Sequence, residues 1–216
     1  LETFASYYSD EEVIQWGIVS GPMLGNTCAV FDLKKDCFNY DEYLLLYSSL
    51  NPFTQFISDL AVLKSIISTS GSGAEMLYDA LFLSIYDLSP FAPWDKNMLS
   101  WSNMNGVPIF SVPDIDQFTI DWREDAHHVI IVFTDEPGDS YLYPKIMMND
   151  LTNMLPTADD VTVYTFTSSS SSIKSTWEPV ASAGGGKWYP LPPVPGPIYE
   201  SLMEILDETA CGDTGE

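Results

Sequence analysis

Three carboxylates follow a strongly apolar run in the second half of the chain. The run covers 128–134, is rich in valine and isoleucine, and is followed by Asp135, Glu136 and Asp139. A continuous apolar run of this kind is typical of a strand that is buried on both faces of a parallel sheet. Ligands of open parallel sheets bind at the carboxyl ends of the strands. The position of these acids therefore favours a binding site over a hydrated turn.

The charge of the chain restricts its partners. The 216 residues include 31 acidic and 8 basic ones, which gives a net charge of -23. Such a surface repels nucleic acids and anionic membranes, and it suits divalent cations, basic partners or a salty medium. The chain has no apolar run of the roughly 18 residues that a membrane-spanning helix needs. We therefore predict neither nucleic-acid binding nor membrane insertion by this segment.

The three cysteines give a hint about the compartment. Cys28 and Cys37 flank a short charged loop, and a disulfide between them would staple a hairpin. A disulfide implies an oxidising, extracytoplasmic compartment. Cys211 is then left over, so it is either free or paired with a cysteine outside these residues. No cysteine and histidine spacing in the chain suggests a zinc site.

Periodicity and turn residues predict an alternation of strands and helices. Expected strands cover 12–20, 27–33, 42–50, 128–134 and 161–167, and a short one follows the glycine triplet at 184–186. Expected helices start at Asn51-Pro52 and cover 74–88, 141–155 and 196–210, with a shorter one ahead of the glycines. Asp139 and Ser140 are expected to cap the helix over 141–155.

This order of elements predicts the fold class. Alternating buried strands and helices indicate an α/β fold with a mostly parallel central sheet flanked by helices. We expect a single domain over 1–216 with an insertion at about 89–122, where periodicity fades and Pro, Asn, Trp and Met gather. The aromatic residues of the insertion either form a partner surface or cover the core.

Four segments together resemble a von Willebrand factor A domain, a Rossmann-like module. "HVIIVFTDEPGD" is similar to its fourth strand, "VTVYTFT" to its fifth and "ASAGGGKWYPL" to its late glycine signature. "STSGSGAEMLYDALFLSIYDL" resembles the loop and helix of its second metal segment. The "GSGAE" and "WREDA" sequences also resemble secreted and lipoprotein members of the family from bacteria. The resemblance covers most of the chain.

The resemblance implies a divalent cation, Mg²⁺, Mn²⁺ or Ca²⁺, at a metal-ion-dependent adhesion site. Asp135 matches the family's third metal segment, and Glu75 stands where the second segment usually has a threonine. Glu75 would either bind the metal or cap the helix. Glu136 and Asp139 are expected to be turn residues. Ser70 and Ser72 lie close to the same loop and are weaker candidates.

The family's first metal segment, Asp-x-Ser-x-Ser, has no match in these residues, and neither does the strand that carries it. Either this segment lies outside the sequence, or another chain supplies it, or the site is lost. The resemblance implies that this first strand is the central one. We therefore expect a groove in the sheet that a partner polypeptide fills.

The sequence contains little that indicates catalysis, so we expect no enzyme. It has no Gly-x-Ser-x-Gly elbow, and His127 and His128 face opposite sides of a strand, which predicts structural roles. The expected function is adhesive or protein recognition at a bacterial cell surface or in another extracytoplasmic space, through the cation. The alternative is a structural subunit of a surface filament or envelope assembly, with a degenerate metal site and a neighbouring subunit as partner.

Overall fold

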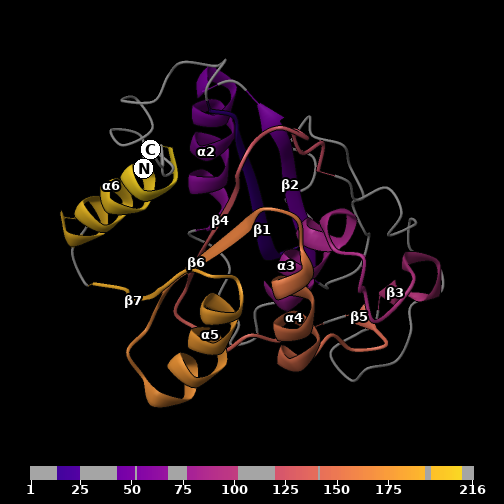
Figure 1. Cartoon of the computed structure of the whole chain (residues 1–216). Coiled ribbons are helices and arrows are strands. Elements are labelled where there is room, and N and C mark those ends of the chain that lie inside the picture. Colours follow the sequence, from indigo (N-terminus) through magenta and orange to yellow (C-terminus); the bar gives the residue numbers. More distant parts are fainter. Residues whose placement is uncertain are drawn as a thin grey trace, which may run out of the picture.

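A three-stranded parallel sheet forms the centre of the protein (Figure 1). The computed structural model describes residues 14–24, 43–51, 53–67, 77–101, 120–140, 142–192 and 196–210. The strands β4 (His128–Thr134), β6 (Val161–Thr167) and β7 (Trp188–Pro190) lie in this order, and both neighbouring pairs are parallel. The predictions of strands over 128–134 and 161–167 are confirmed. Both stretches are rich in the β-branched and aromatic residues that favour strands.

A separate two-stranded antiparallel sheet is formed by a hairpin near the start of the chain. It consists of β1 (Trp16–Leu24) and β2 (Tyr43–Asn51). The strand predicted over 12–20 is shifted in the structure, since β1 begins at Trp16 and continues through Gly21 and Pro22. The ladder is irregular between Ser20 and Met23, and such a bulge accommodates a proline, which has no N–H to donate. The predicted strand over 27–33 and all three cysteines lie outside the described residues.

Helices cover both faces of the sheet (Figure 1). On one face lie α3 (Leu77–Ile85), α4 (Met148–Met154) and α5 (Ser171–Ala183), and on the other lie α2 (Phe53–Ile67) and α6 (Gly196–Ala210). The α3–α5 core contains Ile130, Val132, Val163, Leu81, Leu83, Leu151, Trp177 and Val180. The α2–α6 core contains Val129, Ile131, Tyr164, Phe166, Phe56, Leu202, Ile205 and Leu206. The protein is thus a mixed α/β structure in which alternate residues of β4 and β6 enter opposite cores.

The helix predicted over 74–88 appears as α3, followed by a 3₁₀ turn, η2 (Tyr86–Leu88). Every residue of α3 after Leu77 is buried, as expected for a helix that is apolar nearly all round. In the described part of the insertion, η3 (Lys96–Met98) leads to β3 (Ser100–Trp101), which pairs with β5 (Leu142–Tyr143). Within the described ranges, no helix is both long and apolar enough to cross a membrane.

The prediction of a helix over 141–155 was wrong for its first half. The chain forms β5 and a loop there, and α4 begins only at Met148. Pro144 explains this, because a proline disfavours helical backbone at the residue before it. Asp150 Oδ2 accepts a bond from the N–H of Met147 at 2.8 Å and so satisfies a backbone donor at the start of α4. A 3₁₀ turn, η5 (Leu155–Thr157), follows α4.

A buried hydroxyl in β6 provides a stability test. Thr165 is fully buried, and its Oγ1 has no hydrogen-bond partner among the residues that the structure describes. Thr165→Val removes this unsatisfied group at nearly constant volume, so we expect the free energy of unfolding to rise by about 1 kcal/mol. Chemical denaturation measures this change.

Thr167 in the same strand is the matched control. Its Oγ1 accepts a bond from Trp188 Nε1 at 2.8 Å, so Thr167→Val should lower the free energy of unfolding by about 1 kcal/mol. A loss of stability in both variants would show that the Thr165 hydroxyl has a bonding partner in solution.

Candidate functional site

The turn after β4 is held from two directions. Thr134 Oγ1 accepts a bond from the N–H of Glu136 at 3.0 Å and donates to its carbonyl at 3.2 Å. Trp177 Nε1, on α5, donates to the same carbonyl at 3.1 Å. Asp135 lies inside this turn and is exposed. The backbone around Asp135 is therefore fixed by the strand and by α5, while its carboxylate is accessible to solvent.

The start of α3 packs against the same loop. The N–H of Tyr78 donates to the carbonyl of Asp139 at 3.2 Å. A Cβ atom on Gly138 would lie 2.0 Å from the Tyr78 ring, so this approach requires glycine. The rings of Tyr78 and Trp177 pack in a T-shaped arrangement with 5.2 Å between centroids, and the Tyr78 hydroxyl donates to the carbonyl of Thr176 at 3.3 Å. Burial raises the pKa of Tyr78 above its ordinary value.

A buried polar contact lies behind this loop, between Asp79 on α3 and Ser140. Asp79 is fully buried and Ser140 is 5% exposed. The Ser140 hydroxyl donates to Asp79 Oδ1 and accepts bonds from the N–H groups of Leu142 at 3.2 Å and Ile146 at 3.0 Å. The prediction that Ser140 caps a helix was therefore wrong, since its hydroxyl joins α3 to the β5 loop instead.

Asp139 has partners of its own. Its Oδ1 accepts a bond from the N–H of Ser140 at 2.8 Å and forms an ion pair with Lys145 at 2.6 Å. The lysine compensates the charge of this carboxylate. Asp139 is therefore a residue of the turn, as expected, although it caps no helix.

Of the two predicted metal ligands, only Asp135 can be placed. It lies at the carboxyl end of β4, as the sequence predicted. Glu75 lies outside the described residues, as do Ser70 and Ser72. Within the described part of the chain, no three His, Cys, Asp or Glu side chains are grouped so that they could hold a metal. Among the described residues, this edge therefore has the exposed carboxylate of Asp135 but not a complete set of ligands.

The two histidines at the other end of β4 have no partner in common. His127 Nδ1 contacts Asp160 Oδ1 at 2.5 Å, and its Nε2 contacts Thr162 Oγ1 at 2.9 Å. His128 lies between the carbonyls of Asp159 at 3.1 Å and Arg123 at 2.8 Å. Both rings therefore connect the start of β4 to neighbouring backbone and turns, in agreement with the expected structural roles.

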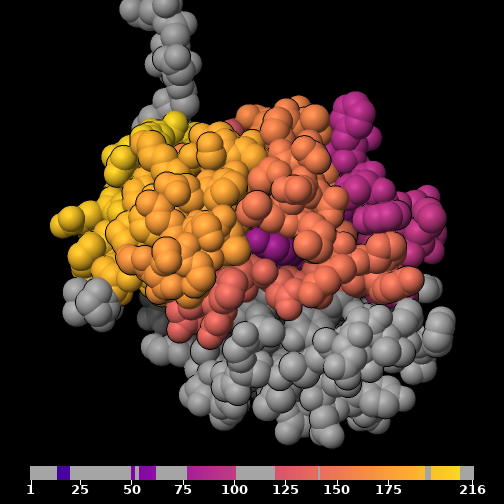
Figure 2. All heavy atoms as spheres, turned by 90° about the horizontal axis from the view of Figure 1, so that it is seen from below, coloured from indigo at the N-terminus to yellow at the C-terminus, as the bar shows by residue number. Residues whose placement is uncertain are grey.

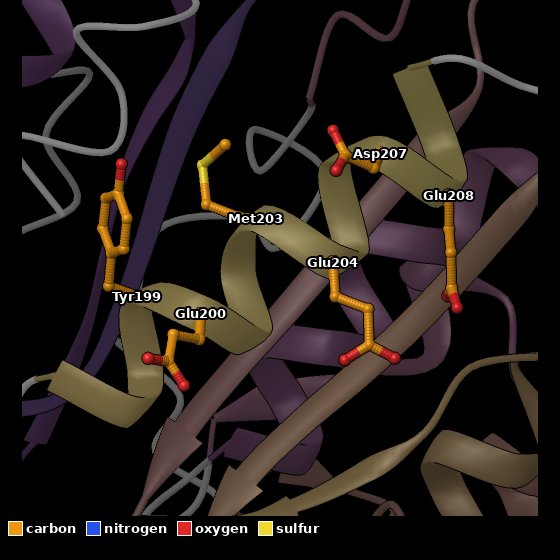
Figure 3. Close-up of a pocket in the computed structure, with 6 residues that line it drawn as sticks. All are labelled: Tyr199, Glu200, Met203, Glu204, Asp207 and Glu208. Carbon is orange, nitrogen blue, oxygen red and sulfur yellow. The ribbon is translucent and has the colours of Figure 1, made fainter.

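A hollow of about 640 Å³, open to solvent, lies on α6, which covers the other face of the sheet from α3 and α5. Figure 3 shows three glutamates pointing to one side of the helix and a tyrosine, a methionine and an aspartate to the other: Glu200, Glu204, Glu208, Tyr199, Met203 and Asp207. Lys187 Nζ contacts Glu208 at 2.6 Å and Glu204 at 3.3 Å, and these bonds raise the pKa of Lys187. This acidic surface is exposed and already has a cation from the chain itself.

The sequence reasoning missed Asp79. The available signal was a single acid inside the nearly all-apolar stretch 77–85. A carboxylic acid in such a stretch is buried with the helix and must find a hydrogen-bond partner there. The partner, Ser140, is 61 residues away in the sequence.

Comparison with known proteins gives no relative for this chain: no protein-family model, no curated protein and no solved structure matches it.

Proposed function

We propose that the chain is a recognition domain of the von Willebrand factor A type that binds a protein ligand through a divalent cation at Asp135. The observation that carries this proposal is the exposed Asp135 carboxylate at the carboxyl end of a parallel strand whose sheet is covered by helices on both faces. Carboxylate oxygens are preferred ligands of Mg²⁺ and Ca²⁺. A position left open on the cation would accept a carboxylate of the protein ligand.

The contact between α3 and the loop supports the participation of Glu75. Glu75 precedes Tyr78 by three residues, and the N–H of Tyr78 is bonded to the carbonyl of Asp139. Three residues span at most about 10 Å. This chain-length limit is compatible with a Glu75 side chain that reaches the same edge as Asp135.

The net charge of -23 supports an acidic recognition surface in an extracytoplasmic setting, where a cation or a basic partner region neutralises the binding edge. Under this proposal the protein ligand contributes the carboxylate, and the chain performs no catalysis.

The second candidate is a structural subunit of a surface assembly without a working cation site. It is favoured by the ion pair of Asp139 with Lys145 and by exposed apolar side chains on the segments around β3 and β5. Figure 2 shows the magenta segment 90–100 beside the orange segment 142–150. The exposed fractions are 67% for Phe91, 65% for Met98, 51% for Tyr143 and 56% for Met147.

Calorimetric titration of the purified chain with Mg²⁺, Mn²⁺ and Ca²⁺ separates the two candidates. We expect one saturable site that is lost in Asp135→Asn and weakened at least about tenfold in Glu75→Gln, because each change removes a charged oxygen ligand. Asp121→Asn is the matched control, since Asp121 is an exposed acid on the segment that enters β4 at its opposite end. Absence of saturable binding, or equal binding by Asp135→Asn, would contradict the cation site and favour the structural subunit.

A further inference from the structure

One edge of β4 has no partner strand among the described residues. The N–H of His128 donates to the carbonyl of Asp160 at 2.9 Å, on the side of β6. Because backbone groups alternate along a strand, the N–H groups of Ile130 and Val132 also point toward β6. Those of Val129, Ile131 and Phe133 point the other way, where no described strand pairs with β4.

The hairpin strand β1 lies in the same layer as β4. Trp16 and Ile18 pack into the α2–α6 core, and Val19 packs into the α3–α5 core. Val129 and Ile130 of β4 divide between the same two cores. Helix α2 contacts β1, and so does α3. The layer between the helices therefore continues from β4 to β1, although the two strands are not hydrogen-bonded to each other.

β1 and β4 lie too far apart to be neighbouring strands. Most Cα atoms of β1 lie more than 8 Å from every Cα atom of β4. Neighbouring strands lie about 4.8 Å apart, so two such intervals amount to about 10 Å. Exposure agrees with an open edge, because Ile130 and Ile131 are only half-buried and Phe133 is 36% exposed in a sheet that helices cover on both faces.

We propose that this edge of β4 binds an extended strand of another polypeptide, inserted between β4 and β1. The chemistry of the site defines the partner. Its strand is apolar on both faces, because valine and isoleucine side chains of β4 enter both cores. The segments flanking that strand are neutral or basic, because the chain carries a net charge of -23. Main-chain hydrogen bonds to the outward groups of β4 supply the pairing, as in other cases of strand addition. The proposal does not depend on cation binding.

Amide hydrogen exchange by NMR on the full 216-residue chain tests it. Without a partner, the amides of Val129, Ile131 and Phe133 should exchange at least about 100-fold faster than those of Ile130 and Val132, because only the latter are bonded within the sheet. The probe is a synthetic peptide of seven alternating valines and isoleucines with two lysines at each end. It should slow exchange of the three outward amides at least about tenfold. The same peptide with proline at its centre should leave them unchanged.

Three results would overturn the proposal. Slow exchange of the outward amides without peptide, independent of protein concentration, would show that the chain itself covers the edge. Slow exchange that increases with protein concentration would show that a second copy does. Equal protection by the two peptides, or none by either, would exclude strand addition. Asp135→Asn should respond to the peptide like the unmodified chain, so failure of cation binding leaves this test intact.

Discussion

Replacing Ser140 by alanine is expected to lower the free energy of unfolding by about 3 kcal/mol. The Ser140 hydroxyl makes three bonds in a buried place: it donates to Asp79 and accepts from the N–H groups of Leu142 and Ile146. Alanine removes all three and leaves buried polar groups with fewer partners, and each such loss costs about 1–3 kcal/mol. Urea denaturation followed by circular dichroism measures the change.

A double-mutant cycle identifies the pair responsible. Asp79→Ala combined with Ser140→Ala should show a coupling energy of at least about 1 kcal/mol, because the two residues are in direct contact. Ser175→Ala is the control, since this exposed serine donates to the Ser172 carbonyl within its own helix, α5, and its effect should stay within about 0.5 kcal/mol. Additive effects of the two buried substitutions would contradict the contact between Asp79 and Ser140.

Replacing Gly186 by alanine is expected to cost a similar amount, about 3 kcal/mol, for a different reason. A Cβ atom at this position would lie 2.2 Å from the carbonyl oxygen of Val163 and 2.8 Å from its carbonyl carbon. The obstacle is the backbone of a buried strand, which cannot rotate out of the way as a side chain can. Thermal or chemical denaturation of the variant measures the loss.

The neighbouring glycines separate steric contact from backbone strain. Gly185 has a φ of 71° and open space around its Cβ position, so Gly185→Ala should cost only the roughly 1–2 kcal/mol of left-handed backbone. Gly196, at the start of α6, has neither feature, and Gly196→Ala should change stability by less than about 0.5 kcal/mol. If Gly186→Ala lowered the free energy of unfolding as little as Gly196→Ala, the close approach of Gly186 to β6 would be excluded.

The sequence predicted those elements whose signal is local. The strands over 128–134 and 161–167 and the helix over 196–210 agree with the structure at both ends. β-Branched and aromatic residues mark the two strands, and turn residues at 193–196 mark the start of the helix. The prediction of strands alternating with helices was likewise enough for the mixed α/β class with its helix-covered parallel sheet.

The errors arose where a distant contact overrode a local signal. The stretch after Ser140 contains many helix-forming residues, yet Pro144 and the pairing of β5 with β3 delay the helix to Met148. Ser140 looked like a cap because its nearest neighbours in the sequence allow one. Its actual partner, Asp79, is 61 residues away, and no local pattern indicates which hydroxyl lies beside a buried acid.

The candidate site was predictable as a position but not as a constellation. An acid directly after a buried parallel strand is placed at the carboxyl edge by topology alone, and this located Asp135. The roles of its neighbours depend on tertiary contacts. The ion pair between Asp139 and Lys145, for example, requires the irregular loop that the sequence suggested was a helix.

The hydrogen bonds that hold the turn after β4 have a mechanical consequence. The carbonyl of Glu136 is bonded to Thr134 in the strand and to Trp177 on α5. A pull on a ligand held at Asp135, directed along β4, would pass into the hydrogen bonds of the parallel β4–β6 ladder. These bonds lie across the direction of pull and would be strained together in shear instead of being opened one after another. Under the proposed function, the turn would therefore pass a force on the ligand to the whole ladder at once.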